Sequence, residues 1–253
     1  MTQQKKHIFA LLYIFLLIAF TGCTAKINIR ANSDKSANLD FSMDLGTKLS
    51  ETIRAVGSSL MQMNGETINT DTNVPIFSAQ LIESAFNNTD FENVTITTPT
   101  ESSLNMSGRI PAPENQQATL KASDAKVANF VTCTQSSLTI ILAPETVQAV
   151  ISSMPENLIA YTDLLMAPVF TGEPMSIPDY RDLIATIYGD EIASEMDKAT
   201  VQIALLPPEG KNIKKSSLSD TERARTSSSK AVFTIPLIEF FTLSSPKTFS
   251  ITF

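Results

Sequence analysis

The chain has 253 residues, of which 43% are hydrophobic, and it carries a formal net charge of −7 at pH 7. This length allows one large domain or two small ones with a substantial core. The negative charge argues against nucleic-acid binding, which needs a positive surface that contacts phosphates.

The N-terminal segment has the order of a bacterial export signal. A short basic head precedes an uninterrupted apolar run at 8–20, and small residues lead from that run to Cys23. The run is shorter than the about 20 apolar residues of a membrane-spanning helix. A cysteine at this place resembles a lipobox, with Phe20 where leucine is usual. We therefore predict a signal peptide at 1–22 and a diacylated, for example palmitoylated, Cys23.

Two other interpretations of this segment stay open. Ordinary secretory cleavage near Ala25 would release an unanchored protein, and an uncleaved segment would keep the chain attached to the membrane. All three interpretations place the rest of the chain outside the cytoplasm, at the periplasmic or surface side of the cell envelope. With lipid on Cys23, two or more acyl chains would anchor the domain stably.

The only histidine is His7, which lies within the predicted signal peptide. The mature chain would then have no histidine, the usual general base near neutral pH and the commonest metal ligand. Catalysis by Ser-His-Asp or Cys-His groups and the usual zinc sites are therefore excluded. We expect no cofactor and no metal ion.

The first half of the mature chain predicts two strand pairs with helices between them. Alternating apolar residues predict strands at 26–31, 37–44, 92–98 and 103–110. Polar turn residues at 32–34 join the first two strands in a hairpin. Apolar residues at helical spacing predict helices at 47–63 and 76–86.

The second half repeats this order with additions, after a surface connection at 111–125. Strands are predicted at 127–133, 138–143, 200–206, 231–235 and 248–253, and the segment 237–243 is ambiguous. Helices are predicted from Pro144, at 156–166, at 179–188 and at 190–198, with a loop at 168–178. Gly189 is the expected C-cap of one helix and Asp190 the N-cap of the next.

This order of elements predicts an α+β fold with antiparallel sheets and packed helices. It is also compatible with two copies of a strand-strand-helix-helix-strand-strand unit, at 26–110 and 127–253. A chance match of two hairpin–helix units explains the order equally well.

A flexible polar loop is predicted at 208–230, and it is basic within an acidic protein. Its functional interpretation is contact with anionic lipid headgroups or with a partner. The alternative, which we favour, is a solvated loop without a role in binding. The six basic residues are Lys211, Lys214, Lys215, Arg223, Arg225 and Lys230.

Three further features have structural interpretations. Cys133 lies in a strand-like stretch, where a free cysteine is expected to be buried and inert. The carboxylates of Asp190, Glu191, Glu195 and Asp197 are better explained as a solvated helix face than as a cation site. The alternation of Phe249, Ile251 and Phe253 predicts the buried face of the last strand.

The stretch at 22–49, GCTAKINIRANSDKSANLDFSMDLGTKL, is similar to the LppM-type lipoprotein domain. The similarity lies within the first quarter of the chain. It implies an envelope protein of α+β fold, and it offers no catalytic residues that could be transferred.

We therefore expect a lipid-anchored envelope lipoprotein with a non-enzymatic binding or structural role. Its expected partners are the membrane, through acylated Cys23, and an envelope protein or lipid. An alternative is a carrier that holds an apolar ligand or lipid between helices and sheet. A third hypothesis is a carboxylate-dependent hydrolase, which requires two facing acids about 5–10 Å apart.

Overall fold

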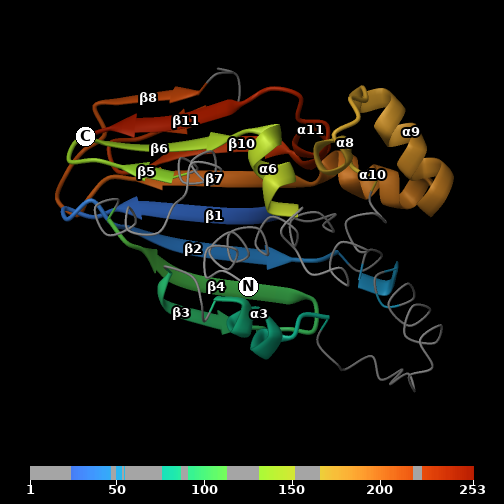
Figure 1. Cartoon of the computed structure of the whole chain (residues 1–253), viewed down its shortest axis with the longest axis horizontal. Helices are drawn as coiled ribbons and strands as arrows, with labels where there is room; N and C mark the ends of the chain where they lie inside the picture. Colours follow the sequence, from blue (N-terminus) through green and yellow to red (C-terminus); the bar gives the residue numbers. More distant parts are fainter. Residues whose placement is uncertain are drawn as a thin grey trace.

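The computed structural model describes residues 24–46, 50–52, 54, 76–86, 91–112, 131–151, 166–218 and 224–253. In this part of the chain, two β-sheets and several helices form an α+β fold, as predicted from the sequence (Figure 1). The larger sheet has seven strands and the smaller one has four. We call them sheet A and sheet B.

Sheet A joins strands from both halves of the chain in the order β3-β4-β2-β1-β7-β10-β9. Neighbouring strands are antiparallel except β1 and β7, which are parallel. The strands are β1 (Thr24–Ala31), β2 (Ala37–Asp44), β3 (Glu92–Thr97), β4 (Ser103–Ile110), β7 (Thr200–Leu206), β9 (Ala224–Thr226) and β10 (Ala231–Pro236).

One face of sheet A is apolar because each strand alternates apolar and polar residues and the registers align them. Ile27 is the register partner of both Phe41 and Ile203, and Phe41 is the partner of Met106. All four side chains are buried. The opposite face carries polar side chains, as in the row formed by Asn28, Asp40 and Ser107.

Sheet B covers part of the apolar face of sheet A. Its strands, all antiparallel, are β5 (Val131–Cys133), β6 (Ser137–Leu142), β11 (Lys247–Thr252) and β8 (Lys215–Leu218). The rings of Phe233 on β10 and Phe249 on β11 meet edge to face, with centroids 5.4 Å apart. The hydroxyls of Ser216 and Thr226 hydrogen-bond at 2.6 Å and join the edge strands β8 and β9. The predicted burial of Phe249, Ile251 and Phe253 is confirmed.

Most of the described helices gather at one end of the sheets (Figure 1). They are α8 (Pro168–Thr171), α9 (Ile177–Tyr188), α10 (Asp190–Lys198) and α11 (Leu237–Phe241), whereas α6 (Pro144–Ile151) lies against α8 and α3 (Ala79–Phe86) lies against β3. The ring of Phe241 packs against those of Phe170 and Tyr180 at this end, with centroid distances of 5.8 Å and 6.0 Å. Burial raises the pKa of the fully buried Tyr180.

Several sequence predictions are wrong in detail. The segment 208–230, expected to be a loop, contains β8 and β9. A short helix, α8, lies within the predicted loop at 168–178, and the ambiguous segment 237–243 forms α11. Gly189 is the C-cap of α9, as predicted, but at φ 93° it is also the N-cap of α10, so the predicted N-cap Asp190 is already the first residue of that helix. Helices are also predicted at 47–63 and 156–166, but most residues of both segments lie outside the described part of the chain.

The strand pairing of the first half is not repeated in the second half. In sheet A, β1, β2, β3 and β4 are neighbours, so the strands at 26–110 stay together. The described strands of 127–253 divide between the sheets, because β7 and β10 extend sheet A whereas β5 and β6 belong to sheet B. The two halves therefore share one continuous sheet.

Candidate functional site: the two ends of sheet A

The start of β1 fixes where an anchor on Cys23 would be attached. Thr24, the first residue of β1, is the register partner of Thr200, and Ala25 is the partner of Val201. Ala25 is 0% exposed. Cys23 lies outside the described residues and directly precedes Thr24 in the sequence. A lipid on Cys23 would therefore join a strand inside the sheet without a linker.

We define the anchor end as Thr24, Asp44, Lys198, Ala199 and Thr200. Asp44 lies level with Thr24, because Lys26 is the register partner of Ser42 two residues earlier. The hydroxyl of Ser102 donates to Asp44 Oδ1 at 3.3 Å. On the other side, Leu237 N donates to the carbonyl of Ala199 at 2.9 Å. Both flanking strands are thus tied to their neighbours at this end.

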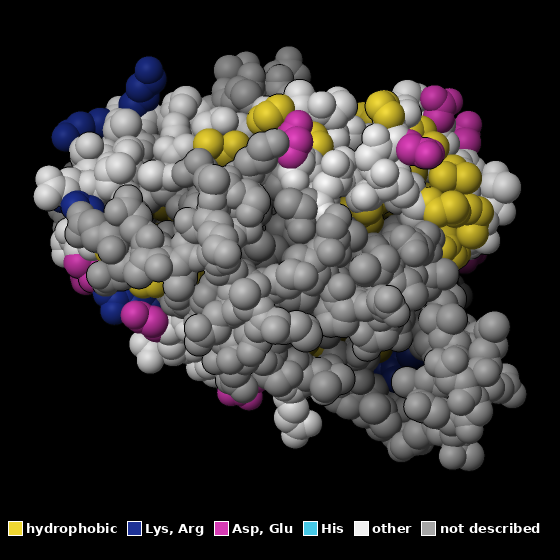
Figure 2. Space-filling view, viewed as in Figure 1, with side chains coloured by type: hydrophobic (Ala, Val, Ile, Leu, Met, Phe, Trp, Pro, Cys, Tyr) yellow, Lys and Arg dark blue, Asp and Glu magenta, His cyan; other side chains and the backbone are white. Residues whose placement is uncertain are grey.

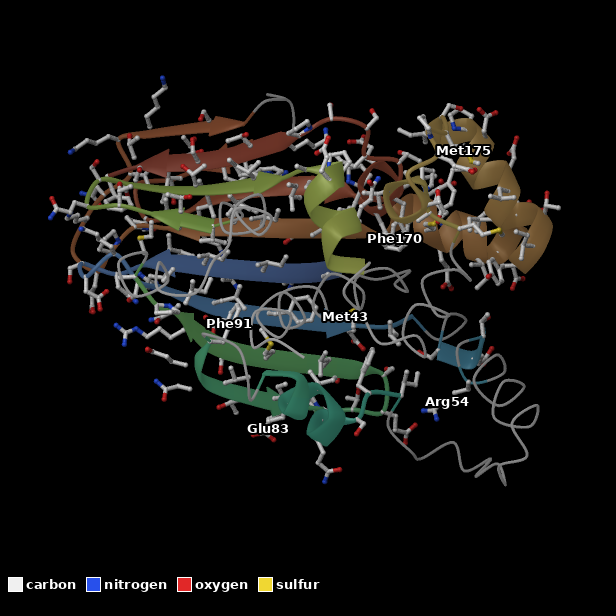
Figure 3. All side chains as sticks on the ribbon, viewed as in Figure 1. Met43, Arg54, Glu83, Phe91, Phe170 and Met175 are labelled. Carbon is white, nitrogen blue, oxygen red and sulfur yellow. The ribbon has the colours of Figure 1, made fainter. Side chains whose placement is uncertain are left out.

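Two side chains labelled in Figure 3 belong to this region. Met43 is buried near the end of β2, and Arg54 forms an ion pair with Glu101 at 3.7 Å. Glu101 precedes Ser102 in the turn before β4. Phe170, also labelled, lies on α8, and Met175 lies between α8 and α9 at the same end of the molecule. The anchor end therefore has charged side chains on one side and the packed helices on the other.

The predicted basic residues lie at the opposite end of sheet A. Because β1 and β7 are parallel, the C-terminal end of β7, which leads to these residues, is the end farthest from Thr24. Dark blue side chains gather at this end in Figure 2. We define the basic end as Lys211, Lys214, Lys215, Arg225 and Lys230; Arg223 lies outside the described residues.

The distance between the two ends follows from the length of β1. Its residues run from Thr24 to Ala31, and strands rise about 3.3 Å per residue. The two ends of β1 are therefore about 23 Å apart. Arg30 Nη1 donates to the carbonyl of Pro207 at 3.4 Å, which ties the end of β1 to the start of the basic segment. If β1 is perpendicular to a flat surface such as a bilayer and the anchor end contacts that surface, the basic end does not contact it.

Two basic side chains are held in place by the protein. Lys211 Nζ donates to the carbonyl of Gln135 at 3.1 Å and lies 5.2 Å from the ring centroid of Phe253. Lys230 Nζ donates to Asn28 Oδ1 at 3.2 Å. Its side chain therefore reaches from the start of β10 across β7 to β1. These two lysines support the surface at the basic end.

The other three basic side chains have no carboxylate partner in the part of the chain that the structure describes. Lys214, Lys215 and Arg225 are exposed. Among the described residues, no carboxylate forms an ion pair with any of the three. Their charges are therefore available to an anionic partner.

The carboxylates nearest the β1–β2 turn are occupied within the protein. Hydrogen bonds from Ser36 Oγ and N, followed by the Arg109 guanidinium, lower the pKa of Asp34. Arg109 also pairs with Glu92 at 3.2 Å. These acids do not neutralise the basic end.

Charge is thus separated along the molecule. The segments 207–218 and 224–230 contain five basic residues and one acidic residue, which gives +4. The segment 177–198, comprising α9 and α10, contains six acidic and two basic residues, which gives −4. The helical end is acidic, and the end reached by β7 and β11 is basic.

The acidic residues of α10 have separate structural surroundings. Asp190 and Glu191 lie in its first turn, and Asp197 accepts a hydrogen bond from Arg181 Nε at 2.7 Å. Glu195 Oε2 is buried and has no hydrogen-bond partner. Within the described ranges, no group of three or more His, Cys, Asp or Glu side chains could hold a metal ion.

The buried position predicted for Cys133 is confirmed. Its side chain is 5% exposed, and burial raises the pKa of the thiol. The thiol lies 3.8 Å from the carbonyl oxygen of Thr134. Cys133 is therefore a packed side chain of sheet B.

Comparisons with known proteins found little. No family model and no curated protein matches the chain. The solved structure of the folded domain of the LppM protein from Mycobacterium tuberculosis is similar, with 6% sequence identity and a TM-score of 0.35. The match covers 92% of this chain and 91% of that domain. At this level the likeness is a weak resemblance of fold, and we base no functional argument on it.

The described residues contain no helix that is long and apolar enough to cross a membrane.

The packing between the two sheets argues against a carrier that holds an apolar ligand there. Phe233 and Phe249 bring the two sheets into direct ring contact at 5.4 Å. Between β10 and β11, side chains therefore occupy the space that such a ligand would need.

Sequence reasoning missed one feature of the surface, a row of hydroxyls across sheet B. Ser250 is the register partner of Ser217 and of Thr139, and Thr139 is the partner of Thr132. The Ser217 and Ser250 hydroxyls hydrogen-bond at 2.6 Å. The available signal was the alternation of polar residues in each strand, but the register that aligns them requires the fold.

Proposed function

We propose that the chain is a lipid-anchored envelope lipoprotein that acts by binding a partner or by a structural role, and not by catalysis. The proposal rests on the export signal at 1–22, on Cys23 after small residues, and on the first residues of β1. The domain would lie outside the cytoplasm. The membrane would be its first partner, through the acylated cysteine.

The single observation that carries this proposal is the burial of Ala25. A secretory cleavage after Ala25 would remove the first two residues of β1, including a fully buried side chain paired with Val201. Cleavage before Cys23 would leave β1 whole. The structure of β1 therefore supports lipoprotein cleavage before Cys23 over secretory cleavage after Ala25. Cleavage after Ala25 would remove residues that sheet A needs for its pairing and its core.

The same geometry suggests how the domain would stand. A lipid on Cys23 would hold the anchor end against the bilayer, because no linker separates the cysteine from β1. The far end of β1, about 23 Å from Thr24, would then face outward with the side of the molecule that carries Lys214 and Lys215, whereas Arg225 lies level with Asn28, about 13 Å from Thr24 along β1. This differs from the interpretation in which the basic residues contact anionic lipid headgroups of the anchoring membrane, which was the less favoured one for 208–230.

A mass measurement with membrane fractionation tests the proposal. The wild type, Cys23→Ala and Cys133→Ala would be expressed in a bacterial host. We expect wild type and Cys133→Ala to lose residues 1–22, gain acyl mass and fractionate with membranes, whereas Cys23→Ala does none of these. Wild type that is cut at Ala25, carries no lipid and stays in the soluble fraction would refute the proposal.

A further inference from the structure

Three cations of the basic end have no carboxylate partner among the residues that the structure describes. Lys214 directly precedes β8, Lys215 is the first residue of β8, and Arg225 lies on β9. All three side chains are exposed. Lys211 and Lys230 are held beside them by hydrogen bonds to Gln135 and Asn28. Unpaired cations on two adjacent sheet edges form a surface suited to a ligand with repeated negative charges.

The surroundings of these cations are rich in hydroxyl groups. Ser216 bonds Thr226 between the two sheet edges, and Ser217 bonds Ser250 on sheet B. Lys215 is the register partner of Thr252, whose side chain is exposed. Hydroxyls donate and accept hydrogen bonds, so they suit a hydrated, hydroxyl-bearing ligand.

The basic end lacks the features of a protein–protein contact with an apolar centre. Such interfaces depend on buried aromatic and other large side chains. Among the described residues, the large hydrophobic side chains classed as exposed are Ile177 and Ile187, and both lie on α9 at the other end. The chemistry of the basic end is therefore charge with hydrogen bonding.

A second copy on the same membrane does not fit this surface. Its acidic helices carry a charge of −4 over 177–198, opposite to the positive charge of the basic end, so the two regions would attract each other. However, copies anchored through Cys23 would all have the helical end near the bilayer and the basic end farther outward, since β1 and β7 run in parallel away from Thr24. The complementary regions would lie at different heights.

We propose that the basic end binds an anionic polyhydroxylated polymer, a chain of sugars or polyols that carries carboxylate or phosphate groups. The cations of Lys214, Lys215 and Arg225 would contact successive anionic groups, and nearby hydroxyls would bond to the chain between them. This inference rests on the proposed anchoring for its outward direction and for where the polymer would be met. It names the partner class of the same envelope protein.

The test uses the full mature protein in a neutral detergent. The probes are polygalacturonate for carboxylates, poly(glycerol phosphate) for phosphates, uncharged dextran, and vesicles of phosphatidylglycerol. Binding constants would be measured across a series of salt concentrations. We compare wild type with Lys214→Gln/Lys215→Gln and with Lys26→Gln/Lys198→Gln. The second pair removes the same charge from exposed lysines outside the basic end.

We expect wild type to bind at least one of the two polymers and not dextran. In the Lys214/Lys215 variant, the slope of log affinity against log salt should fall by about two, with about tenfold weaker binding at low salt. The Lys26/Lys198 variant should bind within about twofold of wild type at physiological salt, because these exposed lysines are not among the residues proposed to contact the polymer and salt screens charges that make no contact. The polymer that binds identifies carboxylate or phosphate as the group recognised.

Equal losses in both variants, full binding by the Lys214/Lys215 variant, or no polymer binding by wild type would overturn the inference. Acyl chains on Cys23 insert into any vesicle, so the vesicle arm is run without detergent and measures the preference for phosphatidylglycerol over neutral phosphatidylcholine vesicles. A preference that is lost in the Lys214→Gln/Lys215→Gln variant, with no polymer binding by wild type, would assign the surface to lipid instead. Intact mass is recorded on the same samples. Polymer binding by protein that lacks acyl mass on Cys23 would refute the anchoring alone, so the two proposals fail separately.

Discussion

Ala25 and Val201 lie side by side in the parallel pair of β1 and β7, and they are 0% and 1% exposed. The contact joins the residue that follows Thr24 to the second half of the chain. Since β1 lies between β2 and β7, its first residues are part of the interior of sheet A. The place at which the predicted export signal ends therefore bears on the stability of the sheet.

Ala25→Asp should destabilise the protein strongly. The substitution places an unpaired carboxylate in the apolar interior, and we expect the free energy of unfolding to fall by about 3 kcal/mol or more. The matched control is Asn38→Asp on β2, an exposed position between Arg30 and Arg109, which should change it by at most about 0.5 kcal/mol. Urea unfolding followed by circular dichroism measures both. Equal stability of the two variants would mean that the start of β1 is not part of the core.

Phe249→Ala should show that the two sheets share one core. Phe249 is fully buried and meets Phe233 edge to face, so the change removes a large side chain and leaves a cavity. We expect a loss of about 3–5 kcal/mol in the free energy of unfolding. Ile187→Ala, at a side chain 44% exposed, should cost less than about 1 kcal/mol. A small effect of Phe249→Ala would contradict the packing of sheet B on sheet A.

The carboxyl of Asp34 should titrate below its usual pKa of 3.8. Because the folded-state pKa is lowered, Asp34 stabilises the fold above about pH 4, and this contribution is lost as the pH falls through the folded-state pKa. Ser36→Ala should raise the pKa of Asp34 more than Arg109→Gln does, since hydrogen bonds from Ser36 are the larger cause. Carboxyl carbon NMR titration tests this order, and an unchanged pKa in Ser36→Ala would contradict it.

Cys133 should react slowly with thiol reagents in the folded protein. Burial raises the pKa of its thiol and limits access, so little reactive thiolate is present at pH 8. In a Cys23→Ala background, the native protein should react far more slowly than the same protein in urea. Adding an exposed cysteine by Asn212→Cys supplies a fast-reacting control. Native Cys133 that reacts as fast as this control would contradict its burial.

Local sequence patterns predict the antiparallel strand pairs well. The strands β1 and β2 alternate between buried and solvent-facing residues around a polar turn, so the hairpin can be inferred from neighbouring residues alone. The same holds for β3 and β4. The parallel pairing of β1 with β7 has no such local signal, because its partners are far apart in the sequence and no turn connects them.

Short edge strands escaped prediction for a different reason. β9 has three residues, Ala224–Thr226, all exposed, and β8 has the sequence KSSL. Their pairing uses backbone groups, while their side chains are mostly polar and lack an apolar pattern. The basic composition of 208–230 was visible in the sequence. To place this basic segment relative to the start of β1, one must know that β7 runs parallel to β1. Composition alone does not give that direction.

The most direct test of the account measures how deeply each end lies at the bilayer. The chain has no tryptophan, so Asp44→Trp and Asn212→Trp each place a single reporter, at the anchor end and in the basic segment. Lipidated protein in vesicles with nitroxide-labelled headgroups gives the quenching of each. We predict strong quenching of Asp44→Trp and little of Asn212→Trp. Equal quenching, or stronger quenching at Asn212→Trp, would contradict an anchor end at the membrane with the basic end facing outward.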